Sequence, residues 1–66
     1  MKTPFNPHQI WKQSADSNRA MAAEYRRLLV GESEPRLQGF YLVRIAECQR
    51  CAKEDDAKAL KYVIGN

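Results

Sequence analysis

Helix-boundary signals divide this chain into two helical segments. Asn6 is a favoured N-cap residue, and Pro7 follows it at the first helical position, where its missing backbone N–H has no partner to lose. Gly31 is a natural left-handed terminator for the first segment. Pro35 opens a second segment, with Ser33 as its cap. These capping and terminating residues therefore predict two helices joined by a short turn.

The first helix, over about 7–30, carries a stripe built from three adjacent lines of heptad spacing. The lines are Trp11, Asn18 and Tyr25; Ser14, Met21 and Leu28; and Ala15, Ala22 and Leu29. This stripe predicts a surface that packs against a partner helix. Because Asn18 lies on it, we expect this residue either to fix the register of the pairing or to sit hydrated at its edge.

The second segment is predicted to be helical, with a strand as the alternative. Its apolar members recur at spacings of three and four: Leu37, Tyr41, Ile45, Cys48 and Ala52. Against a helix, residues 39–45 are rich in strand-forming side chains and begin with glycine. A lone strand has nothing to pair with except the short run 62–64, so the helix is favoured.

An acidic cluster, Glu54, Asp55 and Asp56, falls where the next apolar member of this stripe should stand. One alternative is a second helix that continues to about Ile64 with an acidic notch. The other is a break and a short third helix, with the cluster forming its solvated first turn. The cluster lacks the alternating ligand spacing and central glycine of a calcium loop.

Size and composition limit the architecture to a single small domain. The chain has 66 residues, 44% hydrophobic and 29% charged, which is a globular composition for a domain over 1–66 with a flexible segment at 1–5. No apolar run approaches the roughly 18 to 20 residues of a membrane span, and no signal peptide is evident, so we expect a cytoplasmic protein. The net charge of +3 permits contact with nucleic acid but is also ordinary for a soluble domain.

The sequence offers no complete metal site and no catalytic set. Cys48 and Cys51 share one helix face and could be half of a zinc site, but His8 is the one further good ligand. We therefore predict reduced, metal-free thiols, with Cys48 in the core and Cys51 at its edge; a zinc site shared across a symmetric dimer is the alternative. His8, next to a proline, is expected to be exposed. We predict no cofactor and no enzymatic activity.

The predicted fold is an all-α helical hairpin that self-associates, because its apolar stripes are wider than two helices alone can bury. A homodimer with four packed helices would cover them. Phe40 and Val43 fall outside the main stripe and are the candidate partner-binding face. The favoured function is a small regulatory or accessory protein that acts by helix-mediated protein–protein interaction.

The alternative is a small DNA-binding regulator of three-helix, helix-turn-helix-like type. Its candidate contacts are the arginines Arg19, Arg26, Arg27 and Arg36. A recognition helix normally exposes several polar and basic residues at its start. The second helix here turns strongly apolar after Gln38, which is less typical of such a reader.

Overall fold

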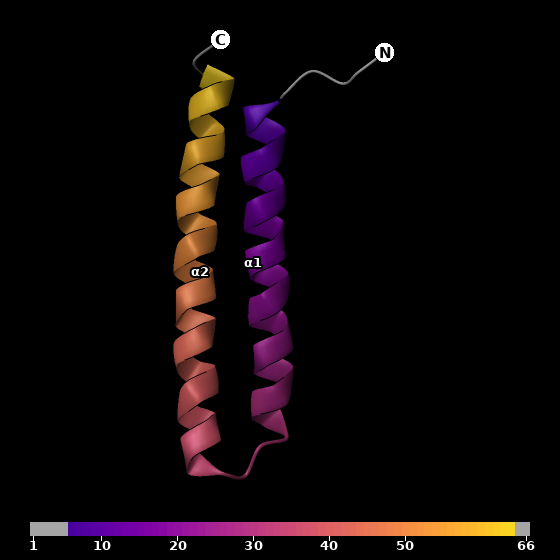
Figure 1. Ribbon diagram of the computed structural model, residues 1–66, viewed down its shortest axis with the longest axis vertical. Coiled ribbons are helices and arrows are strands. Elements are labelled where there is room, and N and C mark those ends of the chain that lie inside the picture. The colour runs from indigo at the N-terminus through magenta and orange to yellow at the C-terminus, as the bar shows by residue number, and fades with distance from the viewer. Residues whose placement is uncertain (1–5, 65–66) are drawn as a thin grey trace.

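The computed structural model describes residues 6–64 and consists of two antiparallel helices. Helix α1 (Pro7–Val30) and helix α2 (Pro35–Ile64) are joined by residues 31–34 (Figure 1). The predicted all-α hairpin is confirmed. Within the described residues the strand alternative for 39–45 is wrong, and 54–64 continue α2 instead of forming a third helix. The flexible segment predicted at 1–5 lies outside the described residues.

The start of α1 follows its sequence signal, whereas its end does not. Asn6 has an extended backbone, with φ −126° and ψ 94°, and its side chain accepts a hydrogen bond from the Gln9 N–H at 3.2 Å. Gly31 has φ −92° and ψ 1°, so the prediction of a left-handed terminator is wrong. The Glu32 N–H donates to the Leu29 carbonyl at 3.1 Å, and the chain leaves the helix without a positive φ.

The start of α2 is stabilised by a loop glutamate and not by Ser33. Because α2 begins at Pro35, the residue that precedes the helix is Glu34. The Glu34 N–H donates to the Glu32 carboxylate at 3.1 Å, and the Gln38 side-chain amide donates to the Glu32 carbonyl at 2.7 Å. Glu32 therefore takes the place at this helix start that the prediction gave to Ser33.

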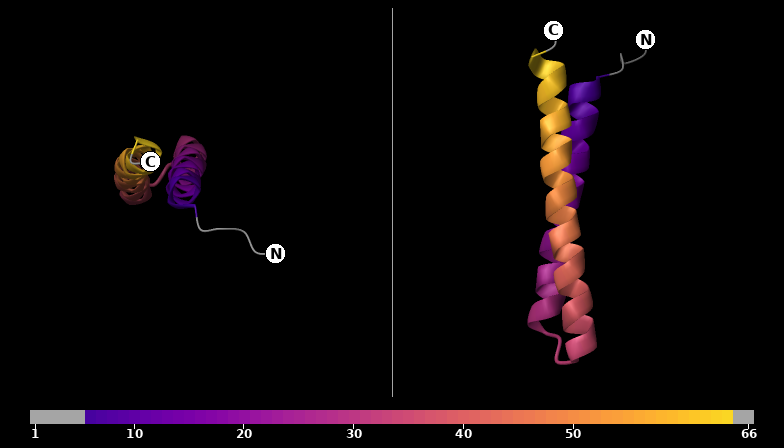
Figure 2. Two further views of the ribbon diagram at one scale, coloured as in Figure 1. Left: turned by 90° about the horizontal axis from the view of Figure 1, so that it is seen from above. Right: turned by 90° about the vertical axis from the view of Figure 1, so that its left-hand side faces the viewer.

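The two helices meet along a seam whose residues alternate at spacings of three and four. Its members on α1 are His8, Trp11, Ala15, Asn18, Ala22, Tyr25 and Leu29; on α2 they are Gln38, Tyr41, Ile45, Cys48, Ala52, Asp55 and Ala59. All of them are buried or half-buried. This repeat is the one that produces shallow left-handed crossing of paired helices, and Figure 2 shows such a crossing. Each described helix packs against the other alone, so the outer sides of both remain uncovered.

The buried core is built mainly from small side chains. Its apolar members are Ala15, Ala22, Ile45, Cys48, Ala52 and Ala59. Ile45 is the one large aliphatic side chain among them, and Tyr25 and Leu29 pack partly buried against its cluster. Small residues in the seam let two helices approach closely, but they bury little apolar area.

Most of the large apolar side chains lie outside this core. Their exposed fractions run from 42% at Leu37 to 87% at Val30. Met21 and Leu28, which the sequence placed on the packing stripe, are 43% and 45% exposed. The stripe that packs is therefore narrower than the predicted one, because a two-helix seam covers only the residues that face the partner directly.

Candidate functional site

The loop end of the hairpin holds a cluster of three aromatic rings. The Phe40 ring meets the Tyr25 ring edge-on, with centroids 6.4 Å apart, and lies 5.7 Å from the Tyr41 ring. The Arg44 guanidinium lies 5.8 Å from the Tyr25 centroid and is bound by the Glu47 carboxylate at 2.7 Å. The Tyr25 hydroxyl, followed by Glu47, raises the pKa of Arg44 above its ordinary value, so this cation stays charged. The ring of Phe40 is fixed on one side by these contacts.

We call Met21, Leu28, Leu37 and Phe40 the loop-end patch. Met21 and Leu28 stand four residues before and three after Tyr25, so they share the side of α1 against which Phe40 packs. Each of the four side chains is between 42% and 51% exposed. The patch therefore places four exposed apolar side chains on one flank of the hairpin, beside the Arg44 cation over the Tyr25 ring.

Val43, the second residue of the predicted partner-binding face, is 56% exposed. It stands three residues after Phe40 and lies on the side of α2 opposite the seam, next to the loop-end patch. Phe40 and Val43 thus lie on adjoining strips of the same helix, and their role in binding a partner stays a prediction.

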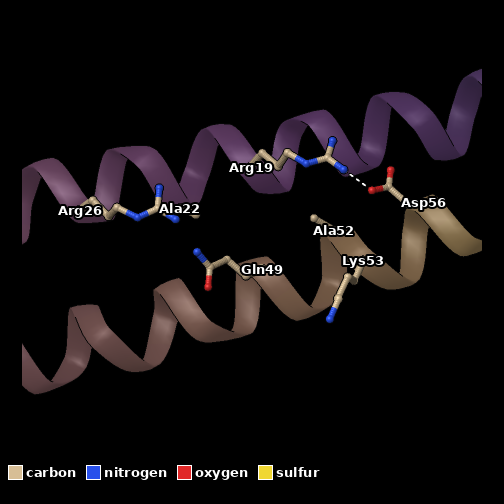
Figure 3. Close-up of a pocket in the computed structure, with 7 residues that line it drawn as sticks. All are labelled: Arg19, Ala22, Arg26, Gln49, Ala52, Lys53 and Asp56. Atoms are coloured by element: carbon tan, nitrogen blue, oxygen red, sulfur yellow. Dashed lines mark hydrogen bonds and ion pairs between the residues drawn. The ribbon is translucent and has the colours of Figure 1, made fainter.

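The opposite flank carries a second surface, which we call the basic groove. It is a hollow of about 300 Å³ between α1 and α2, lined by Arg19, Ala22, Arg26, Gln49, Ala52, Lys53 and Asp56. Figure 3 shows the two arginines along α1 and the Gln49 amide directed into the space between the helices, whereas the Lys53 ammonium points away from α1. The Arg19 guanidinium binds Asp56 across the groove and Asp16 on its own helix at 3.1 Å.

Two of the four arginines proposed as nucleic-acid contacts lie together in this groove, namely Arg19 and Arg26. Arg27 lies on the outer side of α1, where it binds Glu24 at 3.0 Å, and Arg36 stands in the first turn of α2. The four therefore do not form one surface. Lys53 also lines this groove and was not predicted from the sequence, because its nearness to Arg26 depends on which sides of the two helices meet.

A polar layer interrupts the seam at Asp55. The Ser14 hydroxyl and the Asn18 amide of α1 both donate to the Asp55 Oδ2 atom, at 2.7 Å and 3.0 Å. Asp55 is only 7% exposed, so the prediction that the acidic cluster forms a solvated helix start is wrong for this residue. The reason is that α2 continues through it and turns its side chain toward the two donors, which satisfy the buried carboxylate.

The free end of the hairpin is closed by polar contacts. His8 Nδ1 donates to the Ala59 carbonyl at 3.0 Å, so His8 is half-buried and not exposed as predicted. The Lys58 ammonium lies 4.5 Å from the centroid of the Trp11 ring. Because the Ala59 carbonyl oxygen can only accept, the hydrogen bond from His8 requires the proton on Nδ1 and occupies that nitrogen.

The two cysteines are free thiols, Cys48 buried in the seam and Cys51 half-buried beside it. Among residues 6–64 there is no group of three or more His, Cys, Asp or Glu side chains able to hold a metal ion. Neither described helix is long and apolar enough to cross a membrane.

Comparison with protein-family models, with curated proteins and with solved structures found no match to this chain.

Proposed function

We propose that this chain is a small non-catalytic accessory or regulatory protein, which acts by docking its helices on another protein. The observation that supports this proposal is the inverted distribution of apolar side chains. Four alanines and one cysteine make up most of the buried apolar residues, whereas ten large apolar side chains within residues 6–64 are at least 42% exposed. A surface of this kind is typical of a chain whose full burial requires a second molecule.

The free energy still to be gained at the loop-end patch supports docking but also limits it. Complete burial of a Leu, Met or Phe side chain contributes about 1.5–3 kcal/mol, and each patch residue has about half of that left to gain, since it is 42–51% exposed. The four together offer roughly 3–5 kcal/mol, which only reaches the lower part of the association cost of about 4–15 kcal/mol. A partner must therefore cover more surface, and Val43 on the adjoining strip is the nearest apolar extension.

A second copy of the chain is the simplest partner that meets this requirement. Two hairpins packed through their loop-end patches would form a four-helix bundle and bury both patches at once. We expect a homodimer at micromolar concentration. Sedimentation equilibrium of the 7.6 kDa chain measures this directly.

The test of the docking face is the double variant Phe40→Asp, Val43→Asp. We expect it to lose self-association and to lose captured partners in affinity purification, while its helical circular dichroism is retained. The matched control is Gln13→Asp, Ala20→Asp, which adds the same two charges at exposed positions on the outer side of α1, away from both Phe40 and Arg26. A Phe40, Val43 variant with unchanged mass and unchanged partners would contradict the proposed face.

The alternative function, a DNA-binding regulator, has one favourable observation, the grouping of Arg19, Arg26 and Lys53 in one groove. It is disfavoured because an antiparallel hairpin, with no third helix in residues 6–64, does not resemble the crossed pair of a helix-turn-helix. Titration with duplex DNA at physiological salt tests it. Nanomolar, sequence-selective binding would favour this alternative over the docking protein.

A further inference from the structure

We infer that the basic groove receives an acidic amphipathic helix from a partner protein, which completes a three-helix bundle. The inference deepens the proposed function and rests on it, since it assigns the chemistry of one docked partner segment. It concerns the flank opposite the loop-end patch, so the two surfaces are separable by substitution.

The shape of the groove comes from the small residues of the seam. Ala22 of α1 and Ala52 of α2 form its floor, and the hollow between the helices is about 300 Å³. A pair of helices always leaves a furrow on each flank, and short side chains in the seam deepen it. A third helix can then lay its own side chains into the furrow, as in helix-in-groove recognition.

The charge of the groove selects the partner. Its lining carries three cations and one carboxylate, a formal charge of 3 − 1 = +2. Arg19 is already shared between Asp16 and Asp56, whereas Arg26 and Lys53 form no ion pair with the described carboxylates. Lys12 extends the row by standing seven residues before Arg19. The groove therefore offers two unmatched cations and the Gln49 amide as donors to incoming carboxylates.

Two exposed leucines mark the ends of the same flank. Leu42 stands seven residues before Gln49, and Leu60 seven after Lys53, so helical periodicity places both on the groove side of α2. They are 56% and 57% exposed. At 1.5 Å per residue they lie about 27 Å apart, the length of a helix of roughly 18 residues. A fitting helix has apolar side chains near both ends and carboxylates in its middle.

This pattern favours an acidic helix over a nucleic acid. The exposed leucines at both ends of this flank suit the apolar side chains of an amphipathic helix and have no role in contact with a phosphate backbone. Non-specific nucleic-acid binding depends on several unmatched cations, because affinity grows with the number of neutralised phosphates. The groove has two.

The experiment uses the full chain and a fluorescent synthetic peptide of about 20 residues, helix-forming, with leucines near its ends and glutamates in its middle. Fluorescence anisotropy at physiological ionic strength measures its binding. A second peptide with lysines in place of the glutamates is the charge control. We expect the glutamate peptide to bind and the lysine peptide not to bind.

Adjacent arginines provide a matched pair of variants. Arg26→Glu should weaken binding of the glutamate peptide roughly tenfold, and Arg27→Glu, with the same change of charge on the outer side of α1, by less than about twofold. The double variant Arg26→Glu, Lys53→Glu should bind the lysine peptide better than the native chain does. Circular dichroism of each variant checks that the helices persist.

Three results would overturn the inference: no binding of the glutamate peptide, an equal loss with Arg27→Glu, or displacement of the peptide by duplex DNA at lower concentration. The variant Phe40→Asp, Val43→Asp separates the two proposals, because it leaves the groove intact. Peptide binding retained by this variant, with its partners also unchanged, would refute the loop-end face and leave the groove standing. If this variant loses its partners and the native chain does not bind the glutamate peptide, the groove would be refuted and the loop-end face would stand.

Discussion

Replacement of Asp55 by alanine tests whether the polar layer stabilises the hairpin. In the native chain its carboxylate accepts hydrogen bonds from Ser14 at 2.7 Å and Asn18 at 3.0 Å. Hydrogen bonds to a charged group contribute about 1.5–3 kcal/mol each, so the gross loss is roughly 3–6 kcal/mol. Part of it is offset, because the substitution also removes a buried charge and introduces a strong helix former. The donors are half-buried, so water satisfies them in part.

The net expectation is a loss of about 2 kcal/mol in the free energy of unfolding. For a domain of this size that corresponds to a fall in Tm of roughly 8–16 °C. Thermal and urea unfolding, followed by circular dichroism at one fixed protein concentration, measure the change; a fixed concentration matters because self-association would shift the apparent stability.

Asp56→Ala is the matched control, since it removes the same charge one residue later. Asp56 is half-exposed and binds Arg19 at the surface, where an ion pair contributes about 0–1 kcal/mol. The Ser14→Ala, Asp55→Ala cycle should give a coupling energy of at least about 0.5 kcal/mol. The reasoning would be refuted by an Asp55→Ala protein that unfolds at the native temperature or above it, or by an equal loss in the Asp56 control.

Three further changes test other parts of the fold. Gly39→Ala should raise the free energy of unfolding by about 0.5–1 kcal/mol, because the added Cβ meets no atom within 4 Å inside α2; a lower Tm would contradict this. Asn6→Ala removes the acceptor of the Gln9 N–H and should cost about 1 kcal/mol by urea unfolding, whereas an unchanged midpoint would show that this cap is dispensable. Cys48→Ala, Cys51→Ala should leave zinc content at zero and partner binding intact, with stability lowered mainly through the buried Cys48; stoichiometric zinc in the native protein would instead support a site shared between two copies.

Local signals were sufficient to predict the two helices. Asn6 and Pro7 fix the start of α1 through contacts within one turn, and the spacing of three and four along each segment sets the seam. Gly39 and the strand-forming residues after it argued against a helix, but packing against α1 outweighs their propensity. The helical state of residues 39–45 therefore depends on packing against α1, which those residues alone do not reveal.

The polar layer could not be predicted from Asp55 alone. A carboxylate at a stripe position is solvated in one structure and buried in another, depending on donors that here lie 37 and 41 residues away. A signal did exist, since Ser14 and Asn18 interrupt the stripe of α1. Matching polar interruptions across an antiparallel register would have brought them opposite Asp55. No comparable sequence signal placed Lys53 in the basic groove, because only the register of the two helices decides which side of α2 lies beside which side of α1.

The single short connection between the helices determines how the hairpin closes. Contacts beside the loop join residues close in sequence, such as Gln38 and Glu32 with a separation of 6, whereas His8 and Ala59 at the far end are separated by 51. If pairing begins at the loop and advances like a zipper, each new pair closes only a small additional length of chain, so the entropic cost is spread over many small steps. Opening runs in the opposite order. The ends that hold His8 and Trp11 fray first, while the aromatic rings around Phe40 remain together as the last part to separate.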